Sequence, residues 1–161
     1  ADGAIWIVGE SQGFLDLGDE HENDESTLLT FVARLDPATG EPVASLQVPG
    51  LASISTQARA LTVDSLGDMT LIGAASSALS LGERSLPAGG GQDVVAAKFA
   101  PTGAVRWAKR LGDHQDQVAR AIALDTDARI LVGGEFSGVL ADGGVGIHTD
   151  TPQLFVLQFR P

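Results

Sequence analysis

The chain has 161 residues, of which 43% are hydrophobic, and this is enough for one domain with a substantial core. Its formal net charge of -11 argues against nucleic acid and anionic membranes as partners, because binding to either relies on clustered Lys and Arg. The absence of cysteine excludes disulfides and thiolate chemistry, and the sequence has no apolar run of about 18 residues that could insert into a membrane.

The first part of the chain predicts three strands. Residues 4–9 are a short apolar strand, and residues 28–36 alternate with the two-residue period of a strand. A long loop with a strongly acidic centre separates them. Pro37 to Gly40 predicts a tight turn into a return strand at 42–48, because proline presets φ and glycine accepts a positive φ.

The remaining chain continues with short strands, tight turns and long loops, and nothing in it shows a sustained helical period. The Ser- and Gly-rich residues 75–92 and the residues 137–152 are predicted as long loops. Asp64 and Asp125 are predicted to initiate tight turns. The further strands are predicted at 57–64, 68–74, 93–100, 104–111, 117–125, 129–136 and 153–160.

Three matched sets of segments show that the sequence repeats. The most recognisable segment occurs three times, beginning at Phe31, Val95 and Phe155, with a proline six residues later each time. Arg59 to Asp64 matches Arg120 to Asp125. In the third set a glycine closes a short apolar strand, and we align Gly9, Gly73 and Gly133, which are 64 and 60 residues apart.

These repeats predict an all-β fold made of β-propeller blades, each a four-stranded antiparallel meander. The 161 residues then form a single propeller segment of about two and a half blades. Up-and-down connectivity places all the long loops on one side and all the tight turns on the other, so binding is expected on the long-loop side. The blades are predicted at 4–48 (partial), 57–111 (complete) and 117–161 (partial).

The order of these motifs resembles the bacterial SBBP-type repeat, a family whose name refers to a seven-bladed β-propeller. The resemblance is closest from Gly90 to Gly144, and the acidic stretch from Asp19 to Glu25 departs from it. It implies tandem repeats on secreted or cell-surface bacterial proteins, and therefore an extracellular or cell-envelope location. The family has no common catalytic residues, so the resemblance carries no active site to this chain.

Counting strands suggests that the segment belongs to a longer propeller. The predicted strands begin with the second strand of one blade and end with the third strand of another. The missing first and last strands therefore belong to different blades, and the remaining blades of a longer chain are expected as partners.

Two groups of residues are candidate binding sites. Arg59 and Arg120 occupy the same repeat position, where they would receive an anionic ligand or pair with a carboxylate, and His114 and Asp116 lie in the adjacent long loop. A possible Ca²⁺ site is predicted in the acidic loop, where closely spaced carboxylates offer oxygen ligands, although such a loop is also typical of a solvated insertion. Its candidate ligands are Asp16, Asp19, Glu22 and Asp24.

No motif for phosphate binding or nucleophilic catalysis is present, and we predict no catalytic residue. The favoured hypothesis is a non-enzymatic module that binds a protein or glycan partner through its long loops. Two alternatives stay open: a polysaccharide-acting hydrolase or lyase that uses loop carboxylates, and a structural spacer that binds nothing itself.

Overall fold

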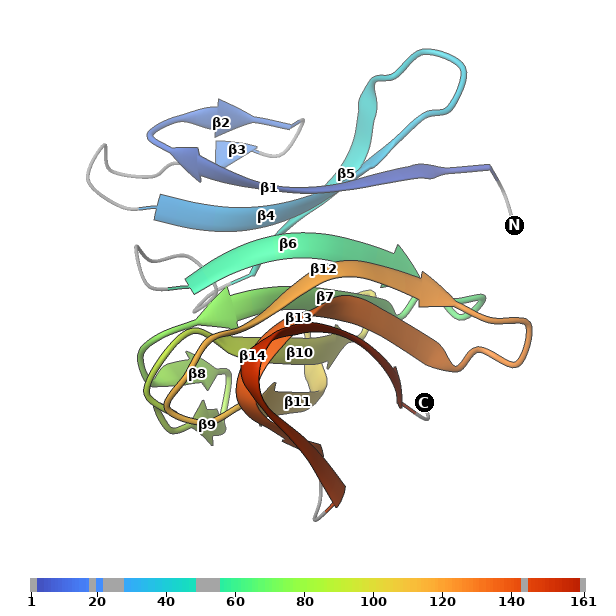
Figure 1. The fold of residues 1–161 in the computed structure, drawn as a ribbon. Coiled ribbons are helices and arrows are strands. Elements are labelled where there is room, and N and C mark those ends of the chain that lie inside the picture. The colour runs from blue at the N-terminus through green and yellow to red at the C-terminus, as the bar shows by residue number, and fades with distance from the viewer. Residues whose placement is uncertain (1–2, 18–19, 22–27, 49–55, 143–144, 160–161) are drawn as a thin grey trace.

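The computed structural model describes residues 3–17, 20–21, 28–48, 56–142 and 145–159, and within these ranges the chain is all β with no helix. Three antiparallel sheets follow one another along the chain and pack as successive layers (Figure 1). The described residues accordingly include no helix that is long and apolar enough to cross a membrane.

Each sheet is an up-and-down meander in which strands that follow in the chain lie side by side, as predicted. Sheet 1 contains β1 (Ile5–Gln12), β4 (Leu28–Leu35) and β5 (Pro42–Val48). Sheet 2 contains β6 (Thr56–Val63), β7 (Met69–Ala75), β10 (Asp93–Phe99) and β11 (Val105–Leu111). Sheet 3 contains β12 (Gln117–Leu124), β13 (Ile130–Asp142) and β14 (Val145–Phe159).

The long connections contain more regular structure than the sequence predicts. The connection in sheet 1 carries a small hairpin of β2 (Leu15–Asp16) and β3 (Glu20–His21). The connection in sheet 2 carries another, β8 (Leu79–Leu81) with β9 (Arg84–Leu86). The buried Leu79 and Leu81 explain the second hairpin, because they pack into the core between sheets 1 and 2.

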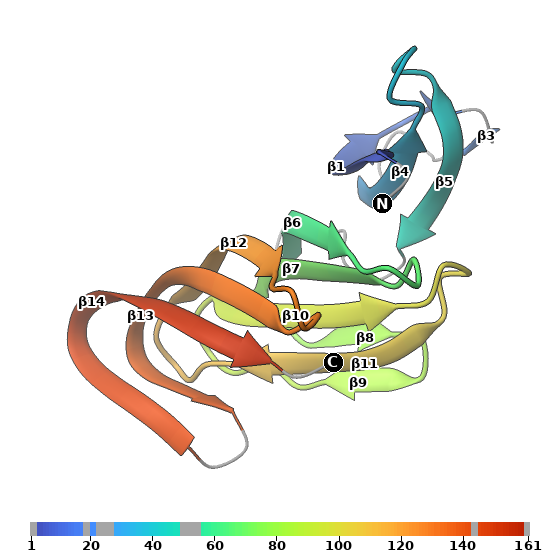
Figure 2. The same cartoon turned by 90° about the vertical axis from the view of Figure 1, so that its right-hand side faces the viewer.

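The prediction of a loop at 137–152 is wrong. Strands β13 and β14 continue through most of this stretch as one long curved hairpin (Figure 2). The pairing register shifts between Phe136 and Gly138, where Gly138 has a φ of 71°, and then resumes. Leu140 is buried in the continuation, so the extension contributes to the core rather than leaving it.

Strand pairing shows which repeat positions are equivalent. Gly9 lies opposite Phe31, Gly73 opposite Val95, and Gly134 opposite Phe155. The equivalent glycines are therefore Gly9, Gly73 and Gly134, and the sequence alignment that used Gly133 is wrong by one residue. The apolar tripeptides at 71–73 and 131–133 look alike in sequence but occupy different positions in their sheets.

A β-bulge explains why glycine occupies this position in sheets 2 and 3. The pairing of β6 with β7 shifts between Ala58 and Ala60, and that of β12 with β13 shifts between Ala119 and Ala121. Each bulge brings a backbone carbonyl against the opposite glycine. A Cβ at Gly73 would lie 2.1 Å from the carbonyl oxygen of Gln57, and one at Gly134 would lie 2.1 Å from that of Val118.

Sheet 2 is covered on both faces, and its two faces form two separate core clusters. Leu71, Val95 and Phe99 pack toward sheet 1, against Val32 and Val48. Alternate residues Ile72, Val94 and Ala96 pack toward sheet 3, against Val132 and Phe155. All residues of β7 and β10 are buried, which explains why these strands read as almost continuous apolar runs.

The two ends of the layered sheets differ. In Figure 1 the β4–β5, β6–β7 and β12–β13 turns lie on the right, whereas the β2–β3 hairpin and the β7–β10 and β11–β12 connections lie on the left. Asp64 and Asp125 initiate two of the tight turns, as predicted. In each, the Oδ1 atom accepts hydrogen bonds from backbone amides that follow it. We call the left end, formed by these longer connections, the long-connection side.

Candidate functional site

A buried ion pair organises the long-connection side of sheet 2. The Arg110 Nε donates to Asp93 Oδ2 at 2.6 Å, and the Asp93 side chain is fully buried. The same guanidinium donates to the carbonyl oxygens of Ala75, Ser77 and Pro87 at 2.6, 2.7 and 2.8 Å. Burial raises the pKa of Asp93 although the Arg110 guanidinium opposes this shift. Arg110 therefore fixes both ends of the connection that carries the β8–β9 hairpin.

A second polar network holds the β11–β12 connection against β13. The buried Gln117 Nε2 donates to Asp113 Oδ1 at 2.9 Å, and the backbone amide of Gln115 donates to the same oxygen at 2.9 Å. Asp113 Oδ2 accepts from the backbone amide of Val139 at 2.9 Å. Burial works to raise the pKa of Asp113, but these hydrogen bonds outweigh it and lower the pKa.

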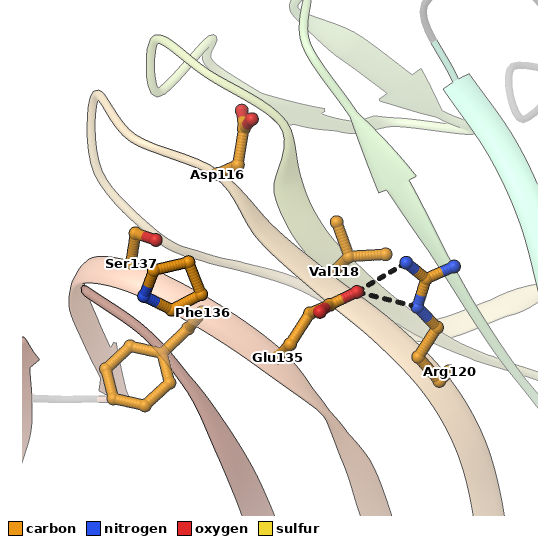
Figure 3. A pocket seen from close by; sticks show the side chains of 7 residues that line it. Asp116, Val118, Arg120, Glu135, Phe136 and Ser137 are labelled. Atoms are coloured by element: carbon orange, nitrogen blue, oxygen red, sulfur yellow. Dashed lines mark hydrogen bonds and ion pairs between the residues drawn. The ribbon is translucent and has the colours of Figure 1, made fainter.

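Beside this network, an open pocket of about 290 Å³ lies on sheet 3 (Figure 3). The Arg120 side chain points at Glu135 in the pocket, and its Nε donates to Glu135 Oε1 at 3.0 Å. Asp116, which comes from the β11–β12 connection, and Ser137, which comes from β13, also line the pocket (Figure 3). The complete lining is Asp116, Val118, Arg120, Glu135, Phe136, Ser137 and Pro152.

The structure brings together two of the four predicted ligand-binding residues. Asp116 and Arg120 line the same pocket, and Asp116 Oδ1 also accepts the backbone amide of Gln92 at 2.9 Å. His114 lies outside the pocket lining and is exposed beside Asp113. Arg59 also lies outside it, on β6, where it donates to Gln57 at 2.7 Å.

The predicted calcium site falls mainly outside the described residues. Asp16 is described and lies in the β2–β3 hairpin, whereas Asp19, Glu22 and Asp24 lie outside the described ranges. Within those ranges, no three His, Asp or Glu side chains are grouped so that they could hold a metal ion. The calcium site therefore stays a prediction.

Sequence reasoning missed Glu135, the residue that completes the pocket with Arg120. A signal was present, because Gly9 is followed by Glu10 and Gly134 is followed by Glu135. With the glycines aligned as the pairing shows, the two glutamates occupy the same repeat position. Asp93 and Arg110 were also missed, although they lie on β10 and β11, the paired strands that the sequence predicts at 93–100 and 104–111.

Comparison with known proteins identifies no relative: no family model matches the chain, and none of the curated proteins matches it.

Proposed function

We propose that the chain is a non-enzymatic β-propeller repeat module of an exported or cell-surface bacterial protein, which binds a protein or glycan partner through its long-connection side. The propeller arrangement is supported by three successive meanders packed face to face with equivalent glycines in equivalent pairs. The bacterial and extracellular parts of the proposal depend on the resemblance to SBBP-type repeats.

One observation supports binding on this side: its connections are held in defined positions by buried side chains. Arg110 fixes the β7–β10 connection through three carbonyl oxygens, and Asp113 fixes the β11–β12 connection through Gln115 and Val139. A loop that is fixed before binding loses less conformational entropy when it meets a partner. Connections ordered in this way are suited to recognition, whereas a spacer has no need of them.

A glycan array, followed by titration calorimetry with any glycan that binds, tests the proposal. The chain is compared with Asp116→Asn and His114→Ala on the long-connection side, and with Leu66→Ser in a tight turn as the matched control. Specific binding that the first two variants weaken and Leu66→Ser leaves unchanged supports the proposal. Binding that only Leu66→Ser alters contradicts it.

A release assay separates the enzymatic alternative from binding. If the chain generates new reducing ends or unsaturated sugars from a polysaccharide, it is a hydrolase or lyase and the non-enzymatic proposal is wrong. If it binds no glycan, a crosslinking screen with surface proteins of a bacterium that encodes the chain tests the protein-partner half. Failure of both screens would favour the structural spacer.

A further inference from the structure

The two faces of sheet 3 have very different environments. Phe155 and Val132 face sheet 2 and are buried in the shared core. Leu154 and Val156, which alternate with Phe155 on β14, lie on the other face and are 86% and 76% exposed. We call the second face, which consists of Leu131, Gly133, Glu135, Leu154, Val156 and Gln158, the open face of sheet 3.

In sheet 2, the face equivalent to this open face is covered by the next sheet of the repeat. Leu154 and Val156 are equivalent to Val94 and Ala96, which precede and follow Val95 as they do Phe155. Val94 and Ala96 are both 0% exposed, because sheet 3 covers them. The open face of sheet 3 is thus the counterpart of a face that, in sheet 2, packs on the next sheet of the repeat.

A polar contact between sheets 1 and 2 sharpens the correspondence. Glu10 is equivalent to Glu135, and its Oε1 accepts the backbone amide of Ala58 at 3.2 Å. Ala58 is the residue at which the β6 bulge begins, so Glu10 reaches across to the first strand of the next sheet. Glu135 lies on the open face, where both of its bonds from Arg120 end on Oε1.

We infer that the open face of sheet 3 is a docking surface for one further antiparallel sheet of the same repeat. Its first strand would carry an Ala-Arg-Ala bulge like those at Arg59 and Arg120. In the docked arrangement Leu154 and Val156 are buried as Val94 and Ala96 are, and Glu135 accepts the bulge amide as Glu10 does. The pocket beside Arg120 becomes a cleft between two sheets. This inference does not depend on whether the long-connection side binds a partner.

The inference is tested by supplying the missing sheet. Because Pro161 matches Pro101 in the repeat, a second copy of residues 102–161 appended after Pro161 continues the chain in register. Leu154→Asp should change the unfolding equilibrium constant of the 161-residue chain less than about threefold. In the extended chain the same substitution should change it about 100-fold, because it buries a charge in a sheet interface.

Leu66→Asp is the matched control, since Leu66 is a 79% exposed leucine in a tight turn, and its effect should be small at both lengths. Hydrogen exchange gives a second readout: the amide of the appended copy of Ala119 should exchange faster in Glu135→Ala. An equal effect of Leu154→Asp at both lengths overturns the inference, whether or not the appended copy folds.

Sedimentation of the 161-residue chain tests whether a second copy of the chain, rather than a further sheet, binds to the open face of sheet 3. If that chain self-associates and Leu154→Asp abolishes the association, the face binds a second copy and the inference is wrong. A chain that stays monomeric at concentrations where the extended chain buries Leu154 supports it. A glycan-binding failure has no bearing on either result, so this test and that of the proposed function fail independently.

Discussion

Sheets 2 and 3 have the same repeat register and the same bulge, yet sheet 2 is covered on both faces and sheet 3 on one. The equivalent positions Ala96 and Val156 are 0% and 76% exposed. The local sequence pattern therefore determines strand pairing in both sheets, whereas the neighbouring layer determines burial. An exposed residue can be assigned to an interface when its repeat counterpart is already in one.

The largest difference between the two sheets is expected at their arginines. Arg110→Met in sheet 2 removes the partner of a buried carboxylate and should cost about 3–5 kcal/mol of unfolding free energy. Arg120→Met in sheet 3 breaks an exposed pair and should cost less than about 1 kcal/mol. Urea unfolding of both variants checks this, and similar costs would contradict the burial that separates the two sites.

Substitutions at Gly134 and Gly133 test which of the two glycines is equivalent to Gly73. Gly134→Ala places a Cβ 2.1 Å from a backbone carbonyl oxygen and should destabilise the chain by about 3 kcal/mol. Gly133→Ala is its matched control, because a Cβ there meets only the carbonyl oxygen of Phe155, at 3.8 Å. Thermal unfolding of the two variants decides between the registers. If Gly133→Ala proved the more harmful, the equivalence with Gly73 would be wrong.

Asp64 and Asp125 occupy equivalent turn positions, and we expect them to contribute differently to the stability of the fold in acid. Burial alone would raise the pKa of both aspartates. Hydrogen bonds from Lys98 and backbone amides outweigh it and lower the pKa of Asp64, and hydrogen bonds from Arg129 and backbone amides likewise lower the pKa of Asp125. A lowered pKa stabilises the fold above the unfolded value of 3.8, and this stabilisation is lost as the pH falls through the folded pKa.

Lys98 and Asp64 form a buried pair at 2.8 Å, whereas the side chains of Arg129 and Asp125 are more exposed. Asp64→Asn should therefore remove more of the acid dependence below pH 3.8 than Asp125→Asn. Unfolding measured from pH 2 to pH 6 checks this. Burial raises the pKa of Asp93, so that residue should act in the opposite direction and favour the folded state as the pH falls toward 3.8.

A smaller effect is expected in the β12–β13 turn. Ala128 has a φ of 57°, and the equivalent residue of the β6–β7 turn is Gly67, with a φ of 81°. Ala128→Gly relieves a left-handed conformation that alanine rarely adopts, and should stabilise the chain by about 0.5–1 kcal/mol. The reverse change, Gly67→Ala, should destabilise it. Loss of stability in Ala128→Gly, measured by urea unfolding, would contradict this account of the turn.

Calcium should affect sheet 1 alone, because the acidic sequence between its first two strands has no counterpart in the other two sheets. If that loop binds Ca²⁺, as the sequence predicts, added calcium should raise the melting temperature relative to EDTA. Neutralising Asp19, Glu22 and Asp24 together should remove the increase, and neutralising Asp113 and Asp127 should not. An unchanged melting temperature in calcium would identify the loop as a solvated insertion.

The ten strands of sheets 1, 2 and 3 and their order could be predicted because their signals are local. The residues from Val95 to Gly103 show both the alternation of a strand and the chemistry of its turn. The extension of β13 and β14 could not be predicted, because the pairing resumes only after a register shift at Gly138. A similar tripeptide at 131–133 led to the wrong alignment, although the turn aspartates indicate the right one, because Gly73 and Gly134 each lie nine residues after Asp64 and Asp125.

The candidate site was only partly accessible from the sequence. Arg120 and Asp116 could be named from the repeat and the loop. Arg110 could not, since its partner Ala75 ends β7 and its partners Ser77 and Pro87 come from the connection after β7, whose path depends on the whole fold.

The central claim, that the open face of sheet 3 is the counterpart of a covered face of sheet 2, is tested most directly by thiol labelling. The chain has no cysteine, so Ala96→Cys and Val156→Cys each introduce a single probe at equivalent positions. The account predicts that Val156→Cys reacts as fast as an unfolded control, and that Ala96→Cys reacts only through unfolding. Rapid labelling of Ala96→Cys, or protection of Val156→Cys in the monomer, would contradict it.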